Sequence, residues 1–175
     1  MMKIAFCFFL GILYFQVSAA QQKIDKIKVT WNLFKAKKPA TAKHPAFTSY
    51  KFNLKTKLVK VDGNTLKLNF DVIFKLDSSK SYMDADRLGV DVALLNHEQG
   101  HADIGVIYAR KLSKELAKAV FYQNGYNAKI TSIFNQVNEL MLKANANYDE
   151  QTQHGTDKTE QLRWKKIIEK LLLVD

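Results

Sequence analysis

Cysteine and proline are scarce in this sequence of 175 residues. It has two prolines and one cysteine, Cys7, which lies in an apolar stretch near the N-terminus. If that stretch is removed on export, the mature chain has no cysteine, which excludes disulfide bonds, thiolate metal ligands and cysteine nucleophiles. The chemistry that remains is that of His, Asp, Glu, Ser, Thr, Tyr and Lys side chains.

Long apolar runs are also missing. The run over residues 4–15 is shorter than the roughly 20 residues that a membrane-spanning helix needs. Lys3 precedes it and small residues at 17–20 follow, an order typical of a cleaved secretory signal peptide. We therefore expect residues 1–20 to be a signal peptide, residues 21–175 to form one domain without a transmembrane span, and the protein to be secreted or periplasmic.

Negative charge is in the minority, because 27 Lys and Arg residues outnumber 17 Asp and Glu and give a formal net charge of +10. The lysines are spread over predicted strands and helices, and no aromatic residues alternate with them in a nucleic-acid-binding motif. This scatter is typical of a solvated basic surface and argues against nucleic acid as a partner. An anionic envelope polymer stays open as a partner beside a peptide or protein substrate.

Alternating apolar and polar residues predict a small antiparallel sheet. Residues 50–58 and 66–74 alternate on either side of a Gly-containing turn, which indicates a hairpin with one buried face. In the second strand, Lys67, Asn69 and Asp71 would face water. A further strand is expected over residues 27–31.

Helical periodicity replaces this alternation in the second half of the chain. Apolar residues at three- and four-residue spacing predict helices over residues 85–124, 130–148 and 157–172, and a break near 111–113 would divide the first of them. Asp157 followed by Glu160 has the spacing of a helix N-cap. The expected fold class is α+β, a small antiparallel sheet followed by three or four helices.

The segment His97-Glu98-Gln99-Gly100-His101 carries the clearest chemistry. Two histidines four residues apart project from one face of a helix, so they can share a zinc ion. Glu98 is offset from both and can act as general base on a metal-activated water that attacks a peptide carbonyl. Without a metal, the two histidines would be ordinary hydrogen-bonding or surface residues.

A catalytic zinc needs three protein ligands and an open position for water. The densest group of candidates for the third ligand is the segment Tyr148–Gly155. His154 is the first choice, because imidazole is a favoured zinc ligand and the neighbouring glycine permits unusual backbone geometry. Asp149 and Glu150 are the alternatives, and the one that does not bind could orient a ligand.

Two further residues, Tyr148 and Asp103, have two readings each, and a third, His44, has one. Tyr148 could hydrogen-bond a developing oxyanion as a catalytic residue, or it could be a packing residue of an apolar helix. Asp103 could orient a ligand or be a surface carboxylate. His44 is interpreted as an ordinary loop histidine, since no candidate ligand lies near it in the sequence.

The chain resembles a family of exported bacterial proteins known as domain of unknown function 922, which are described as predicted zinc-dependent proteases. The likeness rests on residues 29–31, 94–101 with Asp103, 148–155, and Gln161 with Trp164. The resemblance implies a zincin-like fold and a peptidase activity, with zinc on His97, His101 and His154 and with Glu98 as catalytic residue.

Three functions follow as hypotheses. The first is an exported zinc metallopeptidase of the HExxH type. The second is an amide hydrolase that acts on cell-wall peptides, for which a basic surface would suit anionic polymers. The third is a noncatalytic, basic envelope-binding module whose zinc, if it binds any, is held in a closed structural site.

Overall fold

The computed structural model describes residues 24–174, and the expected signal peptide lies outside them. The fold class is α+β, as the sequence predicts. The elements in chain order are the 3-10 helix Trp31–Leu33 (η1), the strands Ala46–Phe47 (β1), Tyr50–Asp62 (β2), Thr65–Leu76 (β3) and Tyr82–Met83 (β4), the helix Val92–Lys118 (α1), the strand Phe121–Tyr122 (β5), and the helices Tyr126–Thr152 (α2) and Lys158–Leu173 (α3).

The predicted hairpin is confirmed as β2 and β3, which pair antiparallel from Tyr50 with Leu76 to Asp62 with Thr65. Strand β5 adds to the other side of β3, so β2 is an edge strand of a three-stranded sheet. The polar residues expected to face water are exposed, namely Lys67, Asn69 and Asp71. Strands β1 and β4 form a separate two-stranded pair.

The strand predicted over residues 27–31 is wrong. The amide of Gln99 accepts from the Val29 backbone N–H and donates to the Ile27 carbonyl, both at 2.8 Å, so a side chain takes the groups that a neighbouring strand would have paired. Asp103 in turn accepts a hydrogen bond from Gln99. The structure thus gives Asp103 a part in holding the N-terminal segment against α1.

Helix α1 is shorter than the predicted 85–124. It begins after Asp91, whose carboxylate accepts the Leu94 N–H as an N-cap, and Gly89 before it has a left-handed backbone with φ of +82°. It ends at Lys118, and the chain continues into β5, which pairs with β3. No break interrupts it at 111–113, and its interior residues Leu112 and Leu116 are each 1% exposed.

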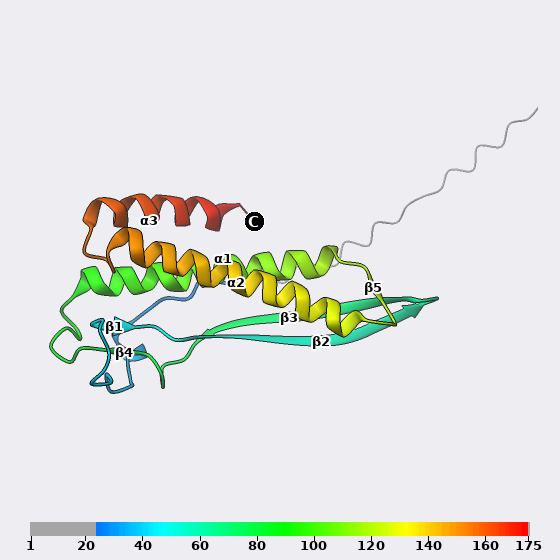
Figure 1. Ribbon diagram of the computed structural model, residues 1–175, viewed down its shortest axis with the longest axis horizontal. Helices are drawn as coiled ribbons and strands as arrows, with labels where there is room; N and C mark the ends of the chain where they lie inside the picture. The colour runs from blue at the N-terminus through cyan, green and yellow to red at the C-terminus, as the bar shows by residue number, and fades with distance from the viewer. Residues whose placement is uncertain (1–23, 175) are drawn as a thin grey trace, which may run out of the picture.

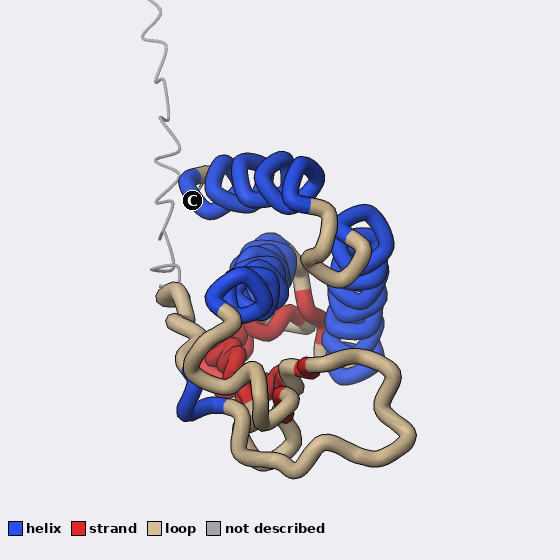
Figure 2. The backbone as a smooth tube through the Cα atoms, turned by 90° about the vertical axis from the view of Figure 1, so that its left-hand side faces the viewer, coloured by secondary structure: helices blue, strands red, loops and turns tan. Residues whose placement is uncertain are grey.

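The helices lie over one face of the sheet. Helix α1 packs on β3, α2 runs beside α1, and α3 lies against both (Figures 1 and 2). Helix α3 begins where expected, with Asp157 accepting the N–H groups of Thr159 and Glu160. The main core lies between α1, the sheet and the other two helices, and a smaller cluster around Val29, Phe34 and Met83 lies beneath the N-terminal half of α1.

Within residues 24–174, none of the helices has the length and apolar character required to cross a membrane.

Candidate metal centre

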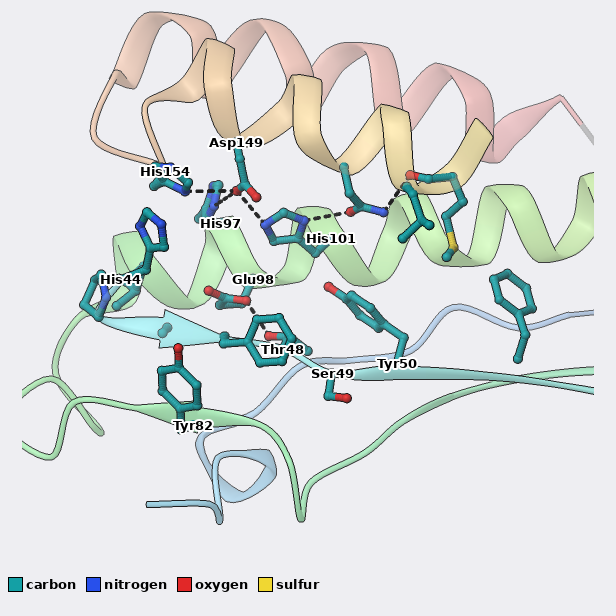
Figure 3. Close-up of a pocket in the computed structure, with 18 of the residues that line it drawn as sticks. His44, Thr48, Ser49, Tyr50, Tyr82, His97, Glu98, His101, Asp149 and His154 are labelled. Atoms are coloured by element: carbon teal, nitrogen blue, oxygen red, sulfur yellow. Dashed lines mark hydrogen bonds and ion pairs between the residues drawn. The ribbon is translucent and has the colours of Figure 1, made fainter. Parts of the chain in front are cut away.

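Helix α1 presents His97 and His101 side by side, and α2 places Asp149 opposite them (Figure 3). Both Nε2 atoms approach the same oxygen, Asp149 Oδ1, at 3.1 Å from His97 and 2.9 Å from His101. The three ligand atoms lie within 4.8 Å of one another. One metal ion could therefore bind all three.

The other nitrogen of each imidazole faces an amide oxygen. His101 Nδ1 lies 2.7 Å from Asn145 Oδ1, and His97 Nδ1 lies 3.2 Å from Gln161 Oε1. Because an amide oxygen only accepts, each Nδ1 carries the hydrogen and donates it. In the neutral rings, each Nε2 then has a lone pair directed toward Asp149 Oδ1. This is the tautomer that a metal ligand requires.

The two amides are themselves held in orientation. Asn145 Nδ2 donates to the Met141 carbonyl at 3.0 Å, and Gln161 Nε2 donates to the Tyr148 hydroxyl. The Tyr148 hydroxyl donates onward to the His97 carbonyl at 3.2 Å. Sequence reasoning missed Asn145, although its spacing of four residues from Asp149 on a helix is a signal that could have found it.

Tyr148 is fully buried, and its ring stacks on His97 with centroids 4.7 Å apart. It is not among the residues that line the cavity described below. Its hydroxyl already has two partners within the protein. These contacts favour the packing reading, in which Tyr148 orients His97 and Gln161, over the role of an oxyanion donor.

The charges at the site depend on one another. Burial alone would raise the pKa of Asp149, but its hydrogen bonds with His101 and then His97, which require a proton on each Nε2 in the metal-free protein, outweigh burial and hold that pKa below its ordinary value. Burial would likewise lower the pKa of His101, yet the hydrogen bond to Asp149 and then the charge of Glu98 raise it. The carboxylate therefore stays ionised and favours a positive charge beside it.

Two glycines make this close packing possible. A Cβ at Gly100 would collide with the Tyr148 ring, and a Cβ at Gly155 would lie 2.8 Å from Cβ and Cγ of His97. Gly155 also has a left-handed φ of +83°. Both glycines belong to the segments singled out in the sequence, and the contacts explain why no larger residue fits.

Glu98 is 3% exposed, and the Thr48 hydroxyl donates to its Oε2. Its carboxylate borders the same cavity as His97 and His101 but is not part of the ligand group. Thr48 was not predicted, because only the tertiary fold brings the segment before β2 to α1. The arrangement suits a base held beside a metal rather than bound to it.

His154 lies just after α2, in a left-handed backbone with φ of 54°. Its Nδ1 is 3.4 Å from Asp149 Oδ1, and its ring lies against that of His44, tilted by 31° with centroids 3.9 Å apart. It is exposed and is not in the ligand group, whereas Asp149, one of the two alternatives, is. Glu150, the other alternative, is exposed on α2. His44 was interpreted as a plain loop residue, but it borders the site.

A cavity of about 600 Å³ opens on this centre. One wall has the polar groups of His97, Glu98, His101 and Asp149. The remainder is largely apolar and aromatic, contributed by the start of β2, by β1 and β4, and by one face of α2, with Phe47, Tyr50, Phe52, Tyr82, Phe134, Met141 and Leu142. Its volume lies in the range of small-molecule and peptide side-chain sites.

The donor set fits zinc. Two imidazole nitrogens and one carboxylate oxygen are ligands that catalytic zinc uses, and a tetrahedral ion with bonds of about 2.0–2.1 Å places its ligands about 3.4 Å apart. The two separations from Asp149, 2.9 and 3.1 Å, are close to that spacing, and all three atoms lie within 4.8 Å of one another. Three ligands also leave one position for water or substrate.

Comparison with known proteins identifies one family. The model of a family described as bacterial protein of unknown function (DUF922) matches residues 14–155, which include all three residues of the candidate metal centre. No curated protein and no solved structure matches the chain.

Proposed function

The chain belongs to the DUF922 family, and we propose that it is an exported zinc-dependent hydrolase that cleaves peptide bonds. The proposal is carried by the meeting of two imidazole lone pairs and an ionised carboxylate oxygen at one point. Negative partial charges this close repel one another unless a proton or a metal ion lies between them. Together with the HExxH segment on α1, this favours a metal, and the ligand types favour zinc.

Zinc held by His97, His101 and Asp149 would lower the pKa of a bound water toward about 7 and polarise a carbonyl oxygen. Glu98 is the general base of the proposed reaction and takes a proton from the attacking water. The Thr48 hydroxyl supports this role, because it bonds one carboxylate oxygen and so fixes the direction in which the other accepts. Tyr148 and Gln161 keep His97 in its metal-binding orientation.

The cavity supports a peptide as substrate. Its apolar lining beyond the metal centre, with Phe52, Phe134, Met141 and Leu142, suits a bulky apolar side chain next to the bond that is cleaved. An amide hydrolase of cell-wall peptides shares the same reaction. We expect faster cleavage of a protein or an apolar peptide than of isolated wall material, and the opposite preference would favour the wall substrate.

The metal and its third ligand are tested by elemental mass spectrometry of the purified protein and of two variants. The parent should bind about one zinc per chain. Asp149→Ala should lose most of it, whereas His154→Ala should keep it, because His154 lies outside the ligand group. The reverse pattern would make His154 the third ligand. A parent protein that binds no zinc after reconstitution would refute the proposed zinc-dependent hydrolase.

The general base is tested by Glu98→Gln. This variant should retain zinc and lose turnover by about 10²–10⁴-fold, the usual contribution of a positioned base. A noncatalytic envelope-binding module would bind zinc in a closed site and show no turnover in either protein. Full activity in Glu98→Gln would show that another group takes the proton.

A further inference from the structure

Tyr50 is the first residue of β2, and its side chain borders the cavity beside the metal centre. Figure 3 shows its hydroxyl directed into the cavity, on the side of Glu98 and His101. Neighbouring Thr48 has its hydroxyl on Glu98. Sequence reasoning assigned Tyr50 only to the buried face of the hairpin and gave it no function.

The Tyr50 hydroxyl is buried without a hydrogen-bond partner. Among the described residues, one other buried side-chain atom, Asp77 Oδ2, makes no hydrogen bond, and that oxygen lies 2.6 Å from the Lys51 ammonium. A buried hydroxyl that bonds nothing destabilises a fold, and the large majority of such groups in proteins are paired. The position of Tyr50 therefore indicates a partner that arrives from the cavity.

Rigid contacts hold the hydroxyl at this place. The Tyr50 ring stacks on Phe74 with centroids 5.4 Å apart, and its backbone pairs with Leu76 in the hairpin. Burial, and after it the charges of Glu98 and Asp149, raise the pKa of Tyr50 well above its ordinary value, although the nearby Thr48 hydroxyl, which donates its hydrogen to Glu98, acts in the opposite direction. The phenol keeps its proton at neutral pH and is available as a donor.

We propose that the Tyr50 hydroxyl donates a hydrogen bond to the carbonyl oxygen of the substrate as that oxygen gains negative charge. This inference rests on the proposed hydrolase function. The donor must be fixed before the reaction and aimed at a charge that develops during it, and a buried, rigid and unpartnered hydroxyl meets both conditions. Tyr148, for which the sequence suggested this role, has its hydroxyl engaged with His97 and Gln161.

Tyr50→Phe removes one oxygen atom and leaves the ring in place. The variant should bind zinc like the parent and lose kcat by about 100-fold with little change in KM, because the bond forms mainly in the transition state. Its thermal midpoint should be equal to or higher than that of the parent, since no hydrogen bond of the folded protein is lost. Tyr122→Phe is the matched control, because Tyr122 is exposed on β5, does not line the cavity and should leave kcat unchanged.

A binding measurement gives a readout apart from turnover. Phenylphosphonate carries a tetrahedral anionic group and an apolar ring, and its binding to the cobalt-substituted protein can be followed by visible absorption. We expect Tyr50→Phe to weaken this binding about tenfold and Tyr122→Phe to leave it unchanged. Equal kcat and equal phosphonate affinity in Tyr50→Phe and parent would overturn the role of Tyr50 while leaving the hydrolase intact. A parent protein that binds no metal would refute both.

Discussion

A single carbon atom added at Gly155 would collide with the ring of His97, whereas one added at Gly63, at the closed end of the β2–β3 hairpin, would meet nothing within 4 Å. Figure 1 shows that end of the hairpin extending past the ends of α1 and α2. Its apolar residues Leu58, Val59 and Val61 are 54%, 48% and 49% exposed. The hairpin end is held by backbone pairing within the hairpin and by backbone contacts with β5 and Gln123, whereas the candidate metal centre depends on close packing of side chains from distant segments.

The largest contrast between the two regions is expected from replacing each glycine by alanine. Both backbones are left-handed, so each change costs about 1–2 kcal/mol of strain. Gly155→Ala adds the collision with His97, which brings its cost to about 2–4 kcal/mol, and it should also weaken zinc binding. Urea unfolding and zinc titration measure the two effects.

Gly63→Ala is the control for strain alone. It should keep the zinc affinity of the parent, and its free energy of unfolding should fall only by the strain of the left-handed backbone. If both variants lost the same stability and bound zinc equally well, close packing at Gly155 would have no energetic importance, and the contrast between the regions would fail.

The next effect concerns the orientation of a ligand. Asn145→Leu removes the acceptor of His101 Nδ1 and should lower zinc affinity about 10–100-fold, the usual cost of losing such a partner. Asn138→Leu, two turns earlier on α2 and also at the cavity, should bind zinc like the parent. Competition with a chromophoric chelator measures both affinities, and equal affinities would show that Asn145 does not set the tautomer.

The hairpin was predictable because the residue pattern that specifies it lies within one short stretch of the sequence. Alternation over residues 50–58 and 66–74 and a glycine turn suffice to specify two paired strands. The helices were found by their period, but the ends of α1 were missed, since a left-handed Gly89 and the pairing of β5 override the apolar stripe. The strand expected at 27–31 failed because a distant side chain, Gln99, takes its backbone groups.

The candidate metal centre was predictable only in part, because some of its residues are far apart in the sequence. The spacing of His97 and His101 places two candidate ligands on one helix face. The third member of the candidate group, Asp149, lies on another helix, and the sequence alone left it open beside His154 and Glu150. Tyr50 lies about fifty residues from the motif, and no local pattern connects them.

A smaller effect is expected from acidic pH at the base of the hairpin. The ion pair with Lys51, and after it the hydrogen bonds from Ser79, lower the pKa of Asp77 from 3.8 to about 2. A carboxyl group whose pKa is lower in the folded protein than in the unfolded chain stabilises the fold at any pH above its ordinary pKa. This contribution is lost as the pH falls through the lowered pKa. Asp77→Asn should therefore lower the thermal midpoint at neutral pH, with a difference that shrinks toward about pH 2.

Asp62→Asn is the counterpart at the closed end. Asp62 lies 3.5 Å from Lys60, and both side chains are exposed, so solvent screens the pair. Its thermal midpoint should equal that of the parent at every pH. A difference for Asp77→Asn that did not change with pH would mean that the charge of Asp77 has no part in holding the hairpin to the rest of the domain.

The smallest effect is expected from Leu58→Thr at the closed end itself. Leu58 is opposite Leu68 in the hairpin and is 54% exposed, and threonine is compatible with a strand, so the free energy of unfolding should change by less than about 0.5 kcal/mol. Urea unfolding of the parent and the variant at matched concentration measures it. A loss above about 1 kcal/mol would mean that Leu58 is buried in solution, and a concentration dependence of that loss would identify a second copy as the cover.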